Sequence, residues 1–270
     1  MLAELRRRAI RALARRPARW AAAPLFDAVV AAELAACRAA DARATPSFGR
    51  LDDVTALIKT FERPAACARL LESVRRVLPG VRVVVVDDSA RPRRWPDVVN
   101  VHPGHDVSAA EGRNAGLRAI DTELFLLLDD DFVVHRGTDV ARAAAFLRAH
   151  PEVDLLGGEV IDLPLLTGNV RPVDRACLGT PERSIDGLPV YDRVAQFWVA
   201  RTQRVRAHGW EPRLKLAEHS EFFWRAQGKL TCVFDARFTV LHAKTPFDEA
   251  YMRKRLDTDR YVAILAELGY

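Results

Sequence analysis

Several features that would identify common classes of protein are missing from this 270-residue chain. Its four cysteines are widely scattered and form no CxxC pair, which argues for a reducing compartment and against a structural zinc site. The chain shows no uninterrupted apolar run of about 18 or more residues, so we expect neither a membrane span nor a secretory leader. We therefore expect a cytoplasmic protein, either soluble or peripheral on the inner face of the cytoplasmic membrane.

Glycine-rich phosphate-binding loops are also missing. Neither GxGxxG nor GxxxxGK[ST] follows any predicted strand, and both motifs serve to place backbone amides against phosphates. Their absence disfavours a Rossmann dehydrogenase and a P-loop phosphotransferase. The net charge of +5 is concentrated near the N-terminus, whereas a nucleic-acid-binding groove needs basic residues spread along a surface. We expect no nucleic-acid partner.

The first fifty residues form a basic helical extension. Residues 1–20 contain seven arginines and one acid, with leucines on one side of a helix and arginines largely on the other. This pattern is typical of a helix on an anionic membrane surface, and also of a solvated helix packed on its own domain. A second alanine-rich helix is predicted over residues 25–40. The small, polar residues 41–50 then lead as a linker into a second region, residues 51–270.

From residue 53 onward, short apolar strands alternate with helices. The predicted strands are "VTALIKT", "VRVVVVDDS" and "ELFLLLDDD", and the predicted helices are "PAACARLLESVRRVL", "SAAEGRNAGLRAI" and "TDVARAAAFLRAH". Strands this apolar lack a wet face, which indicates an α/β fold whose parallel sheet is covered by helices on both faces. Ligands of such sheets bind at the carboxyl ends of the strands, where two acidic clusters are expected.

The more acidic of these clusters is "LFLLLDDDFVV", in which three aspartates follow a buried strand. Carboxylates in this position can hold a hard divalent cation while substrate phosphates complete its oxygen shell. A solvated acidic turn or a helix cap would give the same pattern. The motif alone leaves both interpretations open.

A family resemblance narrows these alternatives. The segments "VTALIKTFERP", "VRVVVVDDS", "EGRNAGL" and "LLLDDDFVV" resemble, in order and spacing, the nucleotide-sugar half of family-2-like inverting glycosyltransferases. Further on, "DLLGGEV", "VAQFWVARTQRVRAHGWEPRLKLAEHSEFF" and "FTVLHAKT" resemble more narrowly the β-1,4-N-acetylgalactosaminyltransferases. The similarity covers residues 53–245.

The resemblance implies a GT-A fold, the fold of nucleotide-diphospho-sugar transferases, with a mixed, mostly parallel sheet. Residues 51–135 would form the nucleotide-binding half, residues 136–245 the acceptor and catalytic half, and residues 246–270 C-terminal helices. The implied activity is inverting, metal-dependent transfer of GalNAc or a related hexose from a UDP-sugar to a glycan or lipid-linked hydroxyl. The alternatives are another nucleotide-sugar enzyme, such as a nucleotidyltransferase, and a non-catalytic sugar-nucleotide-binding protein.

The resemblance also assigns residues to the donor. Asp87 or Asp88 would contact the uracil or ribose, because an acceptor-only carboxylate suits their N–H and hydroxyl donors. Thr60 and Arg63 would lie near the base. Arg113 and Asn114, in "EGRNAGL", would face the nucleotide, Arg113 suiting the diphosphate; an exposed helix arginine in a local ion pair is the alternative for Arg113.

The expected metal is Mn²⁺ or Mg²⁺. By resemblance to the DxD motif, Asp129 and Asp131 are the natural pair, with Asp131 favoured for direct metal contact and Asp130 directed at the ribose or at neighbouring side chains. His242 matches a histidine ligand after the last core strand, and imidazole beside carboxylates suits manganese. Lys244 would support the diphosphate.

Inverting transfer also needs a carboxylate that deprotonates the acceptor hydroxyl. Glu221, in "HSEFF", is ranked first and Glu218 is its rival, while an acid at a helix N-terminus is the structural alternative for either. Trp198 and Trp210 would form a sugar-stacking wall or belong to the core. The Pro- and Gly-rich residues 163–192 are expected to shape the acceptor side, as a lid that excludes water.

Overall fold

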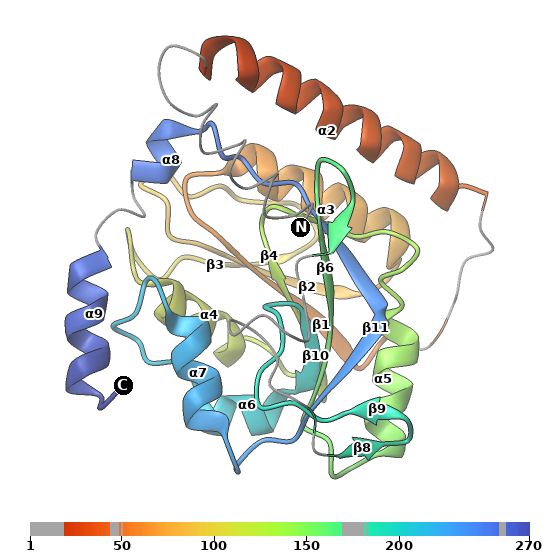
Figure 1. Ribbon diagram of the computed structural model, residues 1–270, viewed down its shortest axis with the longest axis vertical. Helices are drawn as coiled ribbons and strands as arrows, with labels where there is room; N and C mark the ends of the chain where they lie inside the picture. Colours follow the sequence, from red (N-terminus) through yellow and green to blue (C-terminus); the bar gives the residue numbers. More distant parts are fainter. Residues whose placement is uncertain (1–18, 44–48, 50, 169–180, 182, 254–257) are drawn as a thin grey trace.

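The computed structural model describes residues 19–43, 49, 51–168, 181, 183–253 and 258–270 (Figure 1). The basic helix expected over the first eighteen residues lies outside this part of the chain, as does the middle of the expected lid, residues 169–180.

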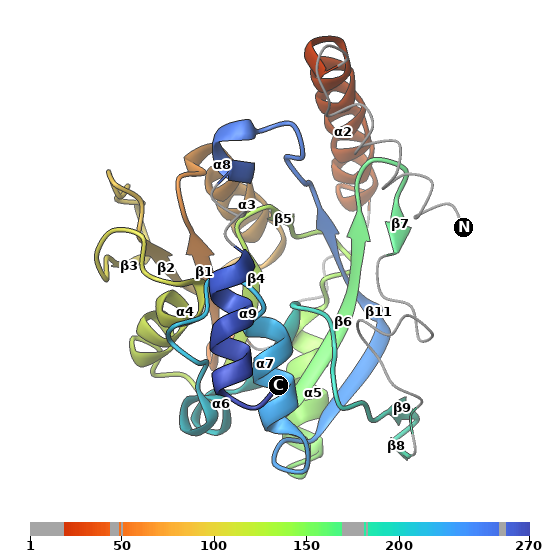
Figure 2. The same ribbon diagram turned by 60° about the vertical axis from the view of Figure 1, so that its left-hand side comes forward.

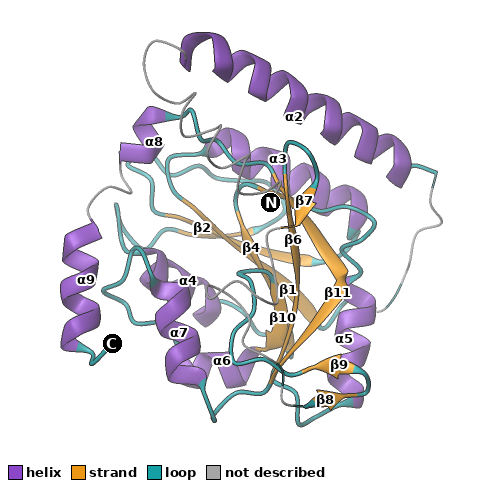
Figure 3. Ribbon diagram, in the orientation of Figure 1, coloured by secondary structure: helices purple, strands orange, loops and turns teal. Residues whose placement is uncertain are grey.

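One mixed sheet forms the centre of the molecule, with helices around it (Figures 1 and 3). Its strands run in the order β3 (Val99–Val101), β2 (Arg82–Asp87), β1 (Val54–Thr60), β4 (Leu124–Asp129), β10 (Trp198–Arg201), β6 (Leu155–Asp162), β11 (Cys232–His242) and β5 (Phe132–Val133). β7 (Thr167–Gly168) pairs with β6, and β8 (Ser184–Ile185) with β9 (Leu188–Pro189) forms a separate hairpin.

Strand direction brings the functional ends together. β1 pairs in parallel with β2 and β4, so that Thr60 lies opposite Asp87 and Lys59 opposite Asp129. β10 is antiparallel to both β4 and β6, and β6 is parallel to β11. The carboxyl ends of β1, β2, β4, β6 and β11 therefore meet at one edge of the sheet, where ligands of α/β proteins bind.

The helices that cover the sheet are α3 (Pro64–Val77), α4 (Ala109–Arg118), α5 (Val140–Ala149), α6 (Thr202–His208) and α7 (Glu218–Ala226), with α8 (Glu249–Arg253) and α9 (Thr258–Glu267) after the last strand. α4 packs directly on β1 and β2. Gly116 permits this close approach, since a Cβ there would lie 2.3 Å from a methyl carbon of Leu57 and 2.6 Å from one of Val86. Every residue of β1 is buried, as its apolar sequence predicts.

Helix α2 (Arg19–Asp41) runs along the outside of the molecule (Figures 1 and 2). Its inner face presents Phe26, Val30 and Leu34 to a small apolar cluster with Leu241 and Phe247. The spacing of three to four residues is that of one helix face. This cluster fixes α2 to the segment that follows β11.

One helix in the described part of the chain, α2, is long and apolar enough to cross a membrane by length and composition alone. This 23-residue helix has a mean hydropathy of 1.5 over an 18-residue window, 17% of which is buried. Asp27 and Glu33 interrupt its apolar run, so the helix contains no long uninterrupted apolar stretch. Core helices of soluble proteins and signal sequences satisfy the same criterion.

Candidate active site

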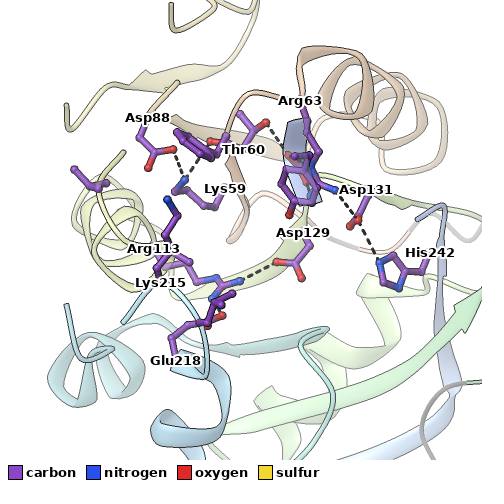
Figure 4. Close-up of a pocket in the computed structure, with 16 residues that line it drawn as sticks. Lys59, Thr60, Arg63, Asp88, Arg113, Asp129, Asp131, Lys215, Glu218 and His242 are labelled. Carbon is purple, nitrogen blue, oxygen red and sulfur yellow. Dashed lines mark hydrogen bonds and ion pairs between the residues drawn. The ribbon is translucent and has the colours of Figure 1, made fainter. Parts of the chain in front are cut away.

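A pocket of about 210 Å³ opens at the carboxyl edge of the sheet (Figure 4). Its walls come from β1, β2 and β4, from the start of α4 and α7, and from the end of β11 together with α8. The residues that line it are Lys59, Thr60, Phe61, Arg63, Asp88, Val107, Ala109, Arg113, Asp129, Asp130, Asp131, Lys215, Leu216, Glu218, His242 and Tyr251.

On the β1–β2 side, the two acids after β2 have different surroundings. Asp87 accepts hydrogen bonds from the backbone N–H groups of Ser89 (3.0 Å) and Arg93 (2.8 Å) and does not line the pocket. Asp88 does line it and is ion-paired with Lys59. Because a carboxylate that stabilises a turn is already satisfied, Asp88 is the one available to a ligand.

The buried Lys59–Asp88 pair is only partly satisfied. Burial lowers the pKa of Lys59 and raises that of Asp88, and each partner opposes the shift of the other. Lys59 bonds to Oδ1 of Asp88, and the buried Oδ2 has no hydrogen-bond partner among the described residues. A buried acceptor that lacks a hydrogen bond costs free energy, and a donor on a bound ligand would recover this free energy.

Arg113 projects from α4 across the pocket and is 5% exposed. It donates to Glu218 Oε1 (2.6 Å) and to Asp129 Oδ1 (2.9 Å) (Figure 4). The exposed ion pair considered as an alternative for Arg113 is thus excluded. Asn114 instead bonds both backbone groups of Trp210, at 2.9 and 3.0 Å, and does not line the pocket.

The three aspartates at the end of β4 have different surroundings, although Asp130 and Asp131 share Arg63 as a partner. Asp129 faces Arg113, whereas Asp130 accepts from Thr60 Oγ1 (2.8 Å) and is ion-paired with Arg63. Burial raises the pKa of Asp130 to about 6, although Arg63 opposes the shift. Asp131 Oδ2 lies 2.9 Å from Arg63 Nη1 and 3.3 Å from His242 Nε2. Burial alone would raise the pKa of Asp131, but the neighbouring His242 ring and the Arg63 guanidinium hold that pKa well below its usual range.

Arg63 and Tyr251 close one wall of the pocket. The guanidinium of Arg63 lies over the Tyr251 ring, 3.9 Å from its centroid. The segment that carries Tyr251 is held by α2, since Phe26 packs edge-on against Phe247 (5.3 Å) and Arg19 donates to the Phe247 carbonyl (2.7 Å). The N-terminal helix therefore supports a wall of the site.

A divalent metal would find two donors here. Within the described residues, no group of three or more His, Cys, Asp or Glu side chains is arranged to hold a metal. However, the 3.3 Å between Asp131 Oδ2 and His242 Nε2 suits two neighbouring ligands of one ion, and Mg²⁺ commonly binds one or two carboxylates plus substrate phosphates. Asp131 and His242 thus fit a metal held jointly with a diphosphate, while Asp129 is directed at Arg113.

The two candidate bases lie on the same helix, α7, but in different surroundings. Glu218 lines the pocket beside Arg113. Glu221 is 1% exposed, does not line the pocket, and is ion-paired through both oxygens with Arg225. Arg225 in turn donates to the carbonyls of His208 and Gly209 at 2.8 Å. This geometry reverses the ranking made from the sequence, because Glu221 has the contacts of a structural ion pair.

The remaining predicted groups lie outside the pocket. Trp198 and Trp210 are buried and stack at 6.0 Å in the core, so they form no sugar-binding wall. Lys244 donates to Asp162 Oδ2 (2.9 Å) and does not line the pocket.

Sequence reasoning missed Lys59, Lys215, Tyr251 and Asp162. Only Lys59 carried a clear signal, as a charge within an otherwise apolar strand.

Comparison with known proteins shows which family the chain resembles. Residues 55–162 match the family model "Glycosyl transferase family 2". The chain is 33% identical over 207 residues to human beta-1,4 N-acetylgalactosaminyltransferase 1, covering 70% of this chain and 39% of that protein. It is 31% identical over 228 residues to the rat protein of that name, covering 75% and 43%. The chain thus spans less than half the length of these curated relatives.

Among solved structures, the chain is similar to S. aureus TarS 1-349 in complex with UDP-GlcNAc. The TM-score is 0.55 at 18% identity, over 72% of this chain and 59% of that one. The fold expected from the sequence is confirmed: the chain contains a glycosyltransferase family 2 domain with the GT-A fold.

Proposed function

We propose that this chain is an inverting glycosyltransferase that moves GalNAc or a related hexose from a UDP-sugar to a hydroxyl of a glycan or lipid-linked acceptor. One observation carries the proposal: a single pocket holds a buried arginine between two carboxylates, an unsatisfied aspartate and a carboxylate–imidazole pair. The names of the relatives and the UDP-GlcNAc complex of the structural neighbour support the donor class.

The donor would lie with its uridine toward β1 and β2. The free Oδ2 of Asp88 would accept from the uracil N–H or a ribose hydroxyl, and Thr60 lies beside it at the end of β1. Arg113 and Lys215 would neutralise the diphosphate from the α4 side. When bound, Mn²⁺ or Mg²⁺ held by Asp131 and His242 would offset charge on the departing UDP.

Glu218 would act as general base. The acceptor hydroxyl gives its proton to the Glu218 carboxylate while its oxygen forms a bond to the anomeric carbon. The bond from that carbon to the β-phosphate oxygen breaks, and its electron pair leaves with UDP. Because attack comes from the face opposite UDP, the anomeric configuration inverts. Arg113 donates to Glu218 Oε1 at 2.6 Å and so restrains the orientation of this carboxylate.

A panel of UDP-sugars tests this proposal. Purified protein with Mn²⁺ should release UDP from at least one of UDP-GalNAc, UDP-GlcNAc, UDP-Gal and UDP-Glc, and Asp131→Ala should abolish the release. Pyrophosphate formation from UTP and a sugar phosphate would support a nucleotidyltransferase instead. Binding of UDP-sugar without turnover would support a non-catalytic binding protein.

The proposal extends to a membrane surface, contacted by residues 1–20 and the outer face of α2. All but two of the exposed side chains of α2 are apolar, the exceptions being Asp27 and Arg38. Trp20 is 79% and Leu25 67% exposed, and the preceding sequence is rich in arginine. Apolar groups on a helix beside a basic segment favour the interface of an anionic bilayer, which would suit a lipid-linked acceptor.

Vesicle flotation tests the membrane contact. The full chain should float with vesicles that contain phosphatidylglycerol and less with pure phosphatidylcholine, and Leu25→Glu should reduce the bound fraction. Leu25 faces away from the body, so the variant leaves the inner face of α2 intact. Equal flotation of the two proteins would contradict a role for α2. A cytoplasmic location on the inner face of the membrane stays a prediction.

A further inference from the structure

Asp162 is a buried carboxylate directly behind the proposed metal position. It ends β6 and pairs in parallel register with His242, which ends β11. Its side chain is 5% exposed. Asp162 Oδ1 lies 2.9 Å from His242 Nδ1, and Oδ2 accepts from Lys244 Nζ at 2.9 Å. Both carboxylate oxygens are therefore engaged, one of them by the candidate metal ligand.

The contact with Asp162 decides which way the imidazole faces. With Nδ1 directed at Asp162, Nε2 points into the pocket, 3.3 Å from Asp131 Oδ2. The Phe132 ring packs edge-on against the imidazole, with centroids 5.1 Å apart and planes at 89°. A carboxylate acceptor at Nδ1 keeps the ring proton on that nitrogen and leaves the Nε2 lone pair for a metal.

We infer that Asp162 is a positioning residue that fixes the tautomer and the orientation of His242, so that Nε2 and Asp131 Oδ2 form a two-donor site for a divalent cation. This inference rests on the proposed function. Lys244 completes the arrangement, because it binds the second oxygen of Asp162 and restrains the carboxylate. The lysine thus acts on the site through Asp162 and not through direct contact with the diphosphate.

A purely structural role is the competing explanation, since Asp162 also ties the end of β6 to the end of β11. The chain offers a matched control at the other end of the same strand. Asp154, just before β6, is 5% exposed and accepts from Arg204 Nε (2.7 Å) and from the Thr231 backbone N–H (2.9 Å). It resembles Asp162 in burial and in having a cationic partner, but it lies far from the carboxyl edge.

Titration of Mn²⁺ in the presence of UDP, followed by electron paramagnetic resonance, tests the inference without turnover. Asp162→Ala should weaken Mn²⁺ binding by about 10- to 100-fold, the usual cost of losing the carboxylate behind a histidine ligand. Asp162→Asn should bind Mn²⁺ nearly as wild type, because the amide oxygen still accepts from Nδ1. Asp154→Asn should leave Mn²⁺ binding unchanged, whatever its effect on the melting temperature.

Wild-type Mn²⁺ affinity in Asp162→Ala would overturn the inference. If Asp162→Ala fails to fold, Asp162→Leu can replace it, because leucine removes the acceptor and still fills the space. Wild-type Mn²⁺ affinity in Asp162→Leu would likewise count against the inference. If wild-type protein bound UDP but no Mn²⁺, the metal component of the proposed function would fail, and the role of Asp162 with it. If the wild type bound Mn²⁺, and Asp162→Ala and Asp162→Leu bound it equally tightly, only the role of Asp162 would be refuted.

Discussion

Glu218→Gln should lower turnover with little effect on stability, whereas Glu221→Gln should lower stability with little effect on turnover. Both substitutions replace an acid in the first turns of α7. Glu218 lines the pocket, so its loss removes the proposed general base. We expect kcat to fall by about 10²- to 10⁴-fold, the usual contribution of a positioned base. The amide oxygen of glutamine can still accept from Arg113, which keeps its bond to Asp129. Binding of the UDP-sugar and the melting temperature should therefore change little.

Glu221→Gln should act on stability. Removing one partner of a fully buried ion pair costs ~3–5 kcal/mol, but the Arg225 side chain is 30% exposed and keeps two backbone acceptors. We therefore expect a loss of about 2 kcal/mol, which corresponds to a fall in melting temperature of roughly 4–8 °C for a chain of this size. Turnover per folded molecule should persist.

Donor hydrolysis and differential scanning fluorimetry on the two variants and the wild type give both quantities. The reasoning would be refuted if Glu221→Gln lost turnover at an unchanged melting temperature while Glu218→Gln remained active. That result would restore the ranking made from the sequence.

Three further predictions address the pocket and its supports. Arg113→Met should weaken UDP binding by roughly tenfold or more in calorimetry, since charge-assisted hydrogen bonds contribute ~1.5–3 kcal/mol; equal affinity would contradict its contact with the diphosphate. Burial lowers the pKa of His219 to about 3, so the unfolded chain binds this proton more tightly. The contribution of His219 to the free energy of unfolding should be complete above pH ~6.5 and fall by up to about 1.4 kcal/mol per pH unit as the pH drops toward 3. In urea unfolding, His219→Gln should make the dependence of this free energy on pH less steep. An unchanged dependence would show that His219 does not cause it. Phe26→Ala should cost about 3 kcal/mol of unfolding free energy, whereas Leu25→Ala on the exposed face should stay within about 0.5 kcal/mol; equal effects would show that α2 does not pack as described.

The strands and the edge where the site forms could be predicted from the sequence because burial leaves a local record. Continuous apolar runs ending in acids marked β2 and β4, and parallel pairing then required their carboxyl ends to meet. The family resemblance then pointed to Asp87 or Asp88, and to Arg113, Asp131 and His242. All of these except Asp87 line the pocket.

The partners of the site residues could not be predicted, because they depend on how distant elements pack. Glu218 and Glu221 are three residues apart at the start of one helix. Glu221 pairs with Arg225, which is held by the carbonyls of His208 and Gly209, and these contacts depend on how α6 and α7 pack. Likewise, Asp162 and His242 are 80 residues apart and meet only through the register of β6 with β11.

The first sugar product formed from a UDP-sugar provides the most direct test of the central claim. UDP-sugar donors carry an α-linked hexose, and attack from the opposite face with Glu218 as base must give the β anomer. Proton NMR during early donor hydrolysis by wild-type protein with Mn²⁺ should show the β anomer first, with release by Glu218→Gln slower by about 10²- to 10⁴-fold. Initial appearance of the α anomer, or equal release by the variant, would contradict inverting transfer at this pocket.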